Sequence, residues 1–280
     1  MANKSTMAAI FAGRLYLALP LGWVVLVVAL AVAAPWLPLP NPTEMDFAHP
    51  ESGPSLQHWL GTDLDGRDIL SRAIYGARVS LAVSLGAPLI GLVAGTLLGL
   101  IASYYSGWLR TSVLAGLDVM LAFPSLVFAL VLTAVLGPSV QNVTLALGIM
   151  SIPAFARIAR SNALPLLRQE FVFAARTAGA GNAYILLREI LPNMAMPLLT
   201  YVLTIMSVMV LAEGALSFLG VGVPPPTPSW GGMIAEGREA LERVPHISFI
   251  PAVIMFLTML SLNLIGDALR KGYAAAGGTP

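Results

Sequence analysis

Six long apolar stretches dominate this sequence, and they decide what the chain can fold into. They cover residues 15–37, 79–104, 112–136, 143–158, 195–219 and 249–269. About 20 consecutive apolar residues cross the hydrocarbon core of a bilayer as a helix. Because lipid offers no hydrogen-bond partner to an irregular backbone, a spanning segment must satisfy its own amide groups. The pattern therefore predicts an all-α membrane protein with six transmembrane helices.

The charge of the chain agrees with a membrane location. Charged residues make up only 10% of the 280 residues, whereas a soluble domain carries about 25%. The formal net charge of +1 provides no concentrated basic face, so nucleic acid is not an expected partner. Ten of the 15 lysines and arginines fall on the inside if the N-terminus is cytoplasmic. By the positive-inside rule, both termini are predicted to lie in the cytoplasm.

Glycines recur along the second apolar stretch. Gly91, Gly95 and Gly99 are spaced four residues apart, which places them on one face of a helix. Small residues at this spacing let two membrane helices approach closely. The stretch is therefore predicted to pack tightly against a neighbouring helix.

The first outside loop, residues 39–78, contains an acidic segment followed by apolar residues at helical spacing. Thr62 or Asp63 is the expected cap of an amphipathic helix that lies along the membrane or the bundle. The acids do not form an EF-hand loop, because the position that requires glutamate is Ile74. No metal site is predicted here.

The last outside loop contains four prolines, at positions 224, 225, 226 and 228. Prolines stiffen a backbone into an extended conformation, so this segment is predicted to be a rigid strap between two membrane helices. Trp230 is expected near the lipid headgroups, and residues 234–243 are expected to form a short surface helix.

Three acids fall within the spanning segments, namely Asp118, Glu213 and Asp267. Intramembrane carboxylates are costly and often mark function, so these are candidates for the translocation path or for helix packing. Asp267 can pair with Arg270, three residues further on. Glu213 could line an outer vestibule or bond a neighbouring helix. The middle thirds of the helices supply no ionisable chain for a proton relay.

Side chains for catalysis are few. The three histidines are scattered over the outside loops, and the chain has no cysteine for a thiolate nucleophile. There is no G-x-x-x-x-G-K-[ST] phosphate loop, so the chain is not expected to bind ATP in that manner. The sequence therefore predicts a conduit without chemistry of its own, and no cofactor in this chain.

The segment at residues 165–193 interrupts the apolar pattern on the predicted cytoplasmic side. Residues 170–193 of it read EFVFAARTAGAGNAYILLREILPN. Residues 170–177 are good helix formers with an acid in the first turn. Gly179 and Gly181 are expected to stop or bend the chain, and Asn182 to cap a second helix that ends near Pro192. Small alanines would leave a smooth surface for another protein. From the residues alone, a docking element and a plain linker remain equal alternatives.

A resemblance to a known family favours the docking element over the plain linker. Glu170, Ala174, Ala175 and Gly179, followed by Ile-Leu-Pro at 190–192, are similar to the EAA loop of bacterial ABC-importer permeases, E-x-x-x-A-A-x-x-x-G. The segments GTDLDGRDILSRAIYGARVSL, DVMLAFPSLVFALVL, LSFLGVGVPPPTPSWGGM and NLIGDALR resemble, in order, the dipeptide/oligopeptide permeases of the DppC/OppC type. The similarity runs from about residue 15 to residue 270.

The resemblance implies a MetI-like type I importer fold in the bacterial cytoplasmic membrane. It implies that Glu170 to Gly179 is a coupling helix that docks into an ATPase, with Glu170 and Arg176 as polar contacts and Gly179 as the hinge. The expected partners are a second permease of the DppB/OppB type, two ATP-binding subunits that use ATP and magnesium, and an extracytoplasmic peptide-binding protein. The binding protein would dock on the outside loops.

The same resemblance suggests di- or oligopeptides as cargo. Import of nickel or another small nutrient is the alternative within the family, and a self-sufficient secondary transporter is the alternative outside it. The expected organisation is an N-terminal helix and outer loop at 1–78, a permease core at 79–270 and a short cytoplasmic tail at 271–280. This tail, KGYAAAGGTP, departs from the family's D-x-L-D-P-R pattern, and position 171 is Phe where Tyr is common.

Overall fold

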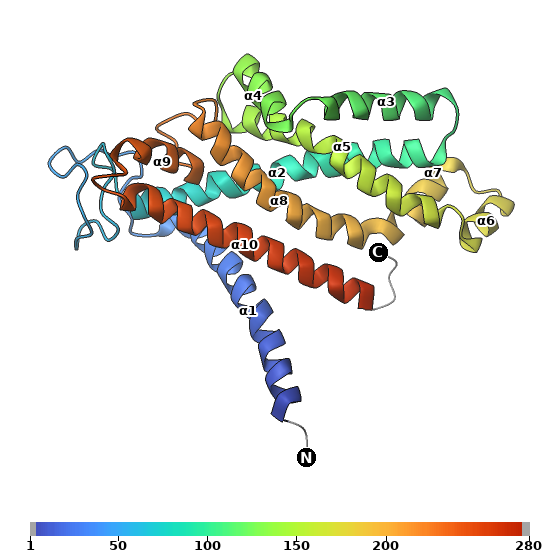
Figure 1. The fold of residues 1–280 in the computed structure, drawn as a ribbon, viewed down its shortest axis with the longest axis horizontal. Coiled ribbons are helices and arrows are strands. Elements are labelled where there is room, and N and C mark those ends of the chain that lie inside the picture. The colour runs from blue at the N-terminus through green and yellow to red at the C-terminus, as the bar shows by residue number, and fades with distance from the viewer. Residues whose placement is uncertain (1–3, 276–280) are drawn as a thin grey trace.

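The computed structural model describes the backbone of residues 4–275 and the side chains of residues 17–273. Within that range the regular structure is helical (Figure 1), apart from an isolated bridge between Thr62 and Asp68. The α-helices are α1 Lys4–Ala33, α2 Ile69–Tyr104, α3 Trp108–Ala122, α4 Ser125–Leu136, α5 Val140–Leu166, α6 Glu170–Thr177, α7 Asn182–Tyr184, α8 Ala195–Phe218, α9 Trp230–Gly237 and α10 His246–Ala275. The predicted all-α class is confirmed.

Five helical segments are long and apolar enough to cross a membrane, and a broken pair brings the number to six. The five are Leu17–Trp36, Ile69–Tyr104, Val140–Leu166, Asn182–Phe218 and His246–Tyr273. The pair is α3 and α4, whose axes meet at 87°. The apolar stretch 112–136 is thus two helices that meet at a sharp bend, and it is not one straight helix. Phe123 precedes Pro124 and is extended, with φ −86° and ψ 137°, because a proline disfavours helical backbone at the residue before it.

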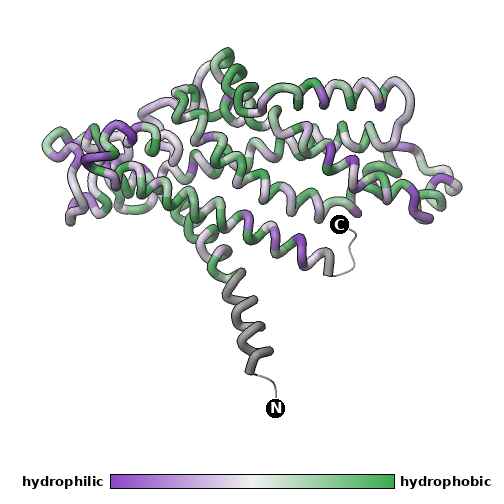
Figure 2. Tube along the Cα trace, viewed as in Figure 1, coloured by the Kyte–Doolittle hydropathy of each residue, from purple (hydrophilic) through white to green (hydrophobic). Residues whose placement is uncertain are grey.

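The bundle has polar ends and an apolar body. Figure 2 shows hydrophilic residues gathered at the end that holds residues 37–68 and α9, and again at the opposite end around α6. We call these the loop end and the α6 end. The spanning helices between them are predominantly hydrophobic, as a lipid-facing body requires.

An extensive and close helix contact joins α2 to α5. A methyl group added to Gly95 would lie 2.5 Å from the carbonyl oxygen of Ile152, and one added to Gly99 would lie 2.5 Å from that of Ala156. Both distances are far below van der Waals contact, so only glycine permits this approach. The close packing predicted from the glycine spacing is confirmed.

The outer amphipathic helix is present, but it is not a separate surface helix. Its residues form the first turns of α2, which continues without a break past Arg78. The cap is Asp68, whose side chain accepts a hydrogen bond from the Ser71 amide at 2.7 Å, and not Thr62 or Asp63. Ile69 is fully buried in a cluster with residues of α9 and α10. Protein rather than the membrane surface covers the apolar face, which is why the helix can run on into the bilayer.

The Gly95→Ala variant tests the contact between α2 and α5. The added methyl group must push two backbones apart, and overpacking of this kind costs about 1–3 kcal/mol. We expect a lower melting temperature in circular dichroism of the purified protein in detergent. Gly116→Ala in α3 is the control, since no atom lies within 4 Å of its added methyl group, and it should melt like the parent chain. Equal melting of the two variants would contradict the packing argument.

Candidate functional site

The α6 end carries a short amphipathic helix that sits outside the membrane body (Figure 1). In α6, Glu170 occupies the first turn and Arg176 the last, an order that suits the helix dipole. Val172 is fully buried and packs in a cluster with Ile185 and Ile190. One face of α6 is thus fixed to the bundle, and the other is exposed.

A tight turn follows α6 and depends on one glycine. Gly179 has φ +81°, a left-handed conformation that residues with a side chain rarely adopt. The amides of Ala178, Gly179 and Ala180 donate hydrogen bonds to the carbonyls of residues 174, 176 and 175 at 3.0 Å each. These bonds satisfy the end of the helix and reverse the chain.

The segment after the turn returns to the membrane as continuous irregular helix. It comprises α7, a π-helical stretch at Ile185–Ile190 and a 3-10 turn at Pro192–Met194, and it leads directly into α8. Asn182 does not cap this segment, because Gly181 precedes α7 without a side-chain cap. Instead the Asn182 side chain accepts a hydrogen bond of 2.7 Å from the Tyr104 hydroxyl. The end of α2 therefore holds the return segment in place.

The exposed face of α6 includes two aromatic rings that the sequence argument passed over. Phe171 is 37% exposed and Phe173 is 53% exposed, beside the exposed Glu170 and Ala174. The Arg176 guanidinium lies 5.4 Å from the centre of the Tyr104 ring, so it also braces α6 against α2. The signal that was missed is the pair of large apolar residues on either side of buried Val172.

Glu213 is fully buried near the loop end and joins three segments. Its carboxylate accepts hydrogen bonds from the hydroxyls of Ser229 at 2.8 Å, Ser217 at 2.9 Å and Ser80 at 3.3 Å. The backbone amide of Gly231 also donates to it. Of the two roles considered, bonding of neighbouring segments is the one the contacts support. The carboxylate fixes the proline strap and the start of α9 to α2 and α8.

Trp230 is also part of this junction. It was expected near the headgroups, but its side chain is fully buried and its indole N–H donates to the Ala73 carbonyl at 3.0 Å. Its backbone amide donates to the Ser80 hydroxyl at 3.1 Å. The helix that it begins is α9, which ends at Gly237, followed by a 3-10 turn at Arg238–Ala240. The predicted surface helix at 234–243 is thus shifted towards the strap and packed into protein.

The other two intramembrane acids are exposed and paired. Asp118 accepts from Arg157 at 3.0 Å, across α3 and α5, with both side chains more than half exposed. Asp267 accepts from Arg270 at 3.1 Å, within α10. The expected pairing of Asp267 is therefore present. Neither pair is buried in the way that Glu213 is.

The loop end holds a denser set of charges. Asp63 pairs with Arg67 at 2.8 Å, and Glu236 pairs with Arg67 at 2.9 Å and with Arg72 at 2.6 Å. Burial raises the pKa of Glu236, while the two guanidinium groups oppose that shift. Among the described residues, no group of histidine and acidic side chains could hold a metal ion. The ion pairs connect α9 to the beginning of α2.

Comparison with known proteins identifies a family and several relatives that this chain resembles. The family described as "Binding-protein-dependent transport system inner membrane component" matches residues 91–274. The glutathione transport system permease proteins GsiD of Escherichia coli O6:K15:H31 and Shigella boydii serotype 4 are each 43% identical over 249 residues, which is 89% of this chain and 82% of theirs.

Solved structures show the same fold. An inward-facing MetNI methionine ABC transporter superposes with a TM-score of 0.56 and 17% identity, covering 72% of this chain and 97% of that chain. An amino acid ABC transporter crystallised with histidines gives a TM-score of 0.56 and 19% identity, covering 72% of this chain and 94% of that chain. These matches confirm the MetI-like permease fold.

Replacing Glu213 with leucine tests the junction at the loop end. The substitution leaves the Ser229 hydroxyl and the Gly231 amide without their acceptor, and each orphaned buried donor costs roughly 1–3 kcal/mol. We expect a lower melting temperature and faster proteolysis of the strap at residues 220–229. Asp118→Asn is the control, because an exposed ion pair contributes only about 0–1 kcal/mol. If both variants behave alike, Glu213 does not hold the strap.

Proposed function

The chain belongs to the family of binding-protein-dependent transport system inner membrane components, and from that premise we propose that it imports short peptides through a complex driven by ATPases docked on α6. Membership makes the chain a multi-pass inner-membrane permease of an ABC importer. It is a translocation subunit rather than an enzyme or a self-sufficient transporter. An ATPase and a binding protein are the partners that such a system implies.

The observation that supports docking at α6 is the helix's two-sided packing. Buried Val172 fixes one face, while Phe171 and Phe173 are exposed on the two flanks beside it and Glu170 is exposed away from it. Exposed aromatic rings are the side chains that most often dominate protein interfaces. We assign the partner as an ATPase subunit and Glu170 as its polar contact, with Gly179 as the turn that sets the angle of the helix. A second permease of the DppB/OppB type and a pair of ATPases complete the proposed complex.

The cargo proposal is supported by the relatives. GsiD is named as a glutathione transport system permease protein, and glutathione is a small peptide. At 43% identity over 249 residues, a cargo of the same chemical class is the simplest inference. Nickel or another small nutrient is the alternative that the transport experiment distinguishes.

The Phe173→Ala and Gly179→Ala variants test docking. If Phe173 is a hot spot of the interface, its truncation costs about 2 kcal/mol or more, so Phe173→Ala should reduce ATPase co-purification at least tenfold. Gly179→Ala should reduce it as well, because the added side chain is strained at φ +81°. Yields are compared after detergent extraction at equal permease levels.

Two variants control for general damage to the fold. Gly181→Ala changes a glycine with φ −71° and open space around it, and Phe249→Ala removes a ring that is 60% exposed at the loop end. Both should retain the ATPase. Retention of the ATPase by Phe173→Ala as well would rule out docking on this face.

Reconstituted uptake tests the cargo. Proteoliposomes that contain this chain, its partner permease and the ATPases, supplied with the binding protein, should accumulate a labelled dipeptide or glutathione only when ATP is present. Labelled nickel is tested in parallel. Accumulation of nickel without peptide would overturn the peptide assignment and leave the permease role intact.

A further inference from the structure

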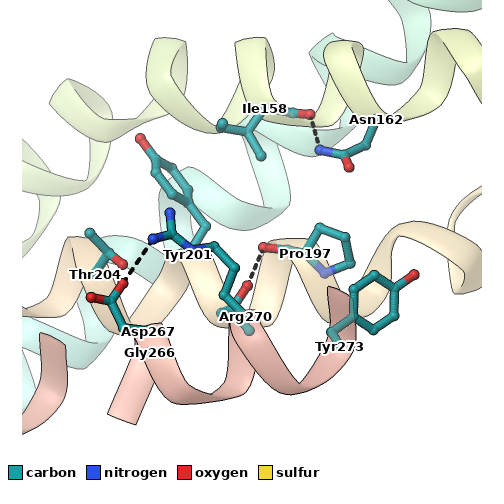
Figure 3. Close-up of a pocket in the computed structure, with 10 residues that line it drawn as sticks. Ile158, Asn162, Pro197, Tyr201, Thr204, Gly266, Asp267, Arg270 and Tyr273 are labelled. Carbon is teal, nitrogen blue, oxygen red and sulfur yellow. Dashed lines mark hydrogen bonds and ion pairs between the residues drawn. The ribbon is translucent and has the colours of Figure 1, made fainter. Parts of the chain in front are cut away.

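A cavity lined by both apolar and polar side chains lies between α5, α8 and α10 near the α6 end, and the Asp267–Arg270 pair described above forms part of its wall. Its volume is about 190 Å³, which is room for several water molecules. Figure 3 shows side chains from all three helices around this space. The polar side chains that line it are Asn162, Thr200, Tyr201, Thr204, Asp267, Arg270 and Tyr273.

The two charged groups of the cavity hold each other only loosely. Arg270 donates to Asp267 at 3.1 Å, and their side chains are 72% and 52% exposed. An exposed pair three residues apart on one helix contributes little to stability. Either group can therefore exchange its partner for a ligand at small cost. Glu213 differs, because it is fully buried and its hydrogen bonds join three segments.

Neutral groups of the cavity are held in position. The Tyr201 ring packs edge-on against Phe155, with ring centres 5.1 Å apart. The Asn162 amide donates one hydrogen bond to the Ile158 carbonyl at 2.8 Å, which leaves its oxygen and its second N–H for another partner. Such groups suit the amide bond of a peptide, which offers one donor and one acceptor.

We infer that this cavity is a binding site for the charged termini of a short peptide, which deepens the proposed function and rests on it. Arg270 takes the peptide carboxylate, because a guanidinium fork matches a carboxylate with two parallel hydrogen bonds. Asp267, released from Arg270, takes the peptide ammonium group. A zwitterion satisfies both charges at once, whereas a simple anion would leave Asp267 unpaired. An extended dipeptide spans at most about 7 Å, so the two side chains, 3.1 Å apart when paired, must separate to hold both termini.

Saturation-transfer NMR of a free dipeptide with the purified permease–ATPase complex tests this site without the binding protein. We expect a transfer signal with the parent complex and a loss of about tenfold in affinity for Arg270→Gln and for Asp267→Asn, since each removes one charge-assisted contact. The same dipeptide with an amidated C-terminus should bind the parent weakly, with no further loss in Arg270→Gln. Likewise, the N-acetylated dipeptide should bind the parent weakly, with no further loss of affinity in Asp267→Asn.

Lys271→Gln is the matched control, because it removes a neighbouring exposed charge from the same helix end and should bind like the parent. Equal binding by all variants would overturn the inference, as would an equal loss with Lys271→Gln. Uptake by the parent complex separates the two proposals. If the parent takes up no peptide, the proposed function fails; if it takes up peptide and shows no saturation transfer, only this site fails.

Discussion

Hydrocarbon offers no partner for hydrogen bonds, and this constraint shapes every polar feature of the protein. Backbone amides are satisfied inside the helices, and side chains such as Thr133 and Ser151 donate back to carbonyls one turn earlier. A fully buried carboxylate is tolerated at Glu213 because several donors converge on it. Most of the other hydrophilic residues gather at the two ends (Figure 2), where partners can reach them.

The sequence predicted those features that depend on local or periodic patterns. The apolar stretches, the glycine face of α2 and the Asp267–Arg270 pair are all readable from spacing, because each involves residues close in the chain. Trp230 was misplaced because its partners, Ser80 and Ala73, lie more than 140 residues earlier. The Asp118–Arg157 pair joins two helices, so no sequence window contains it. The bend of 87° between α3 and α4 was not predicted either, because a proline in an apolar stretch does not fix the angle between the helices on its two sides.

The candidate site likewise has some features that the sequence predicted and others that it could not predict. Helix α6 and its glycine turn were accessible from residues 165–193 alone, and the family resemblance from these residues together with four other segments of the chain. The exposure of Phe171 and Phe173 was not, because it depends on how Val172 and Ala175 pack against the return segment. The cavity beside Arg270 needs three helices from distant parts of the chain. Asp267 and Arg270 stood out in the sequence, but the other polar residues of the cavity did not, and nothing local shows that the three helices bring them together.

Helix α8 links the two ends of the protein mechanically. The segment that follows α6 enters α8 without an intervening loop, and the 24 residues of α8 form a rod about 36 Å long at 1.5 Å per residue. Glu213, five residues before the end of α8, accepts hydrogen bonds from the proline strap and from the start of α9. Because α8 is attached to neighbouring segments at both ends, a tilt of the helix at one end displaces the segments attached to its other end. A displacement of the turn at Gly179 that tilts α8 would therefore also displace the strap and α9 at the loop end.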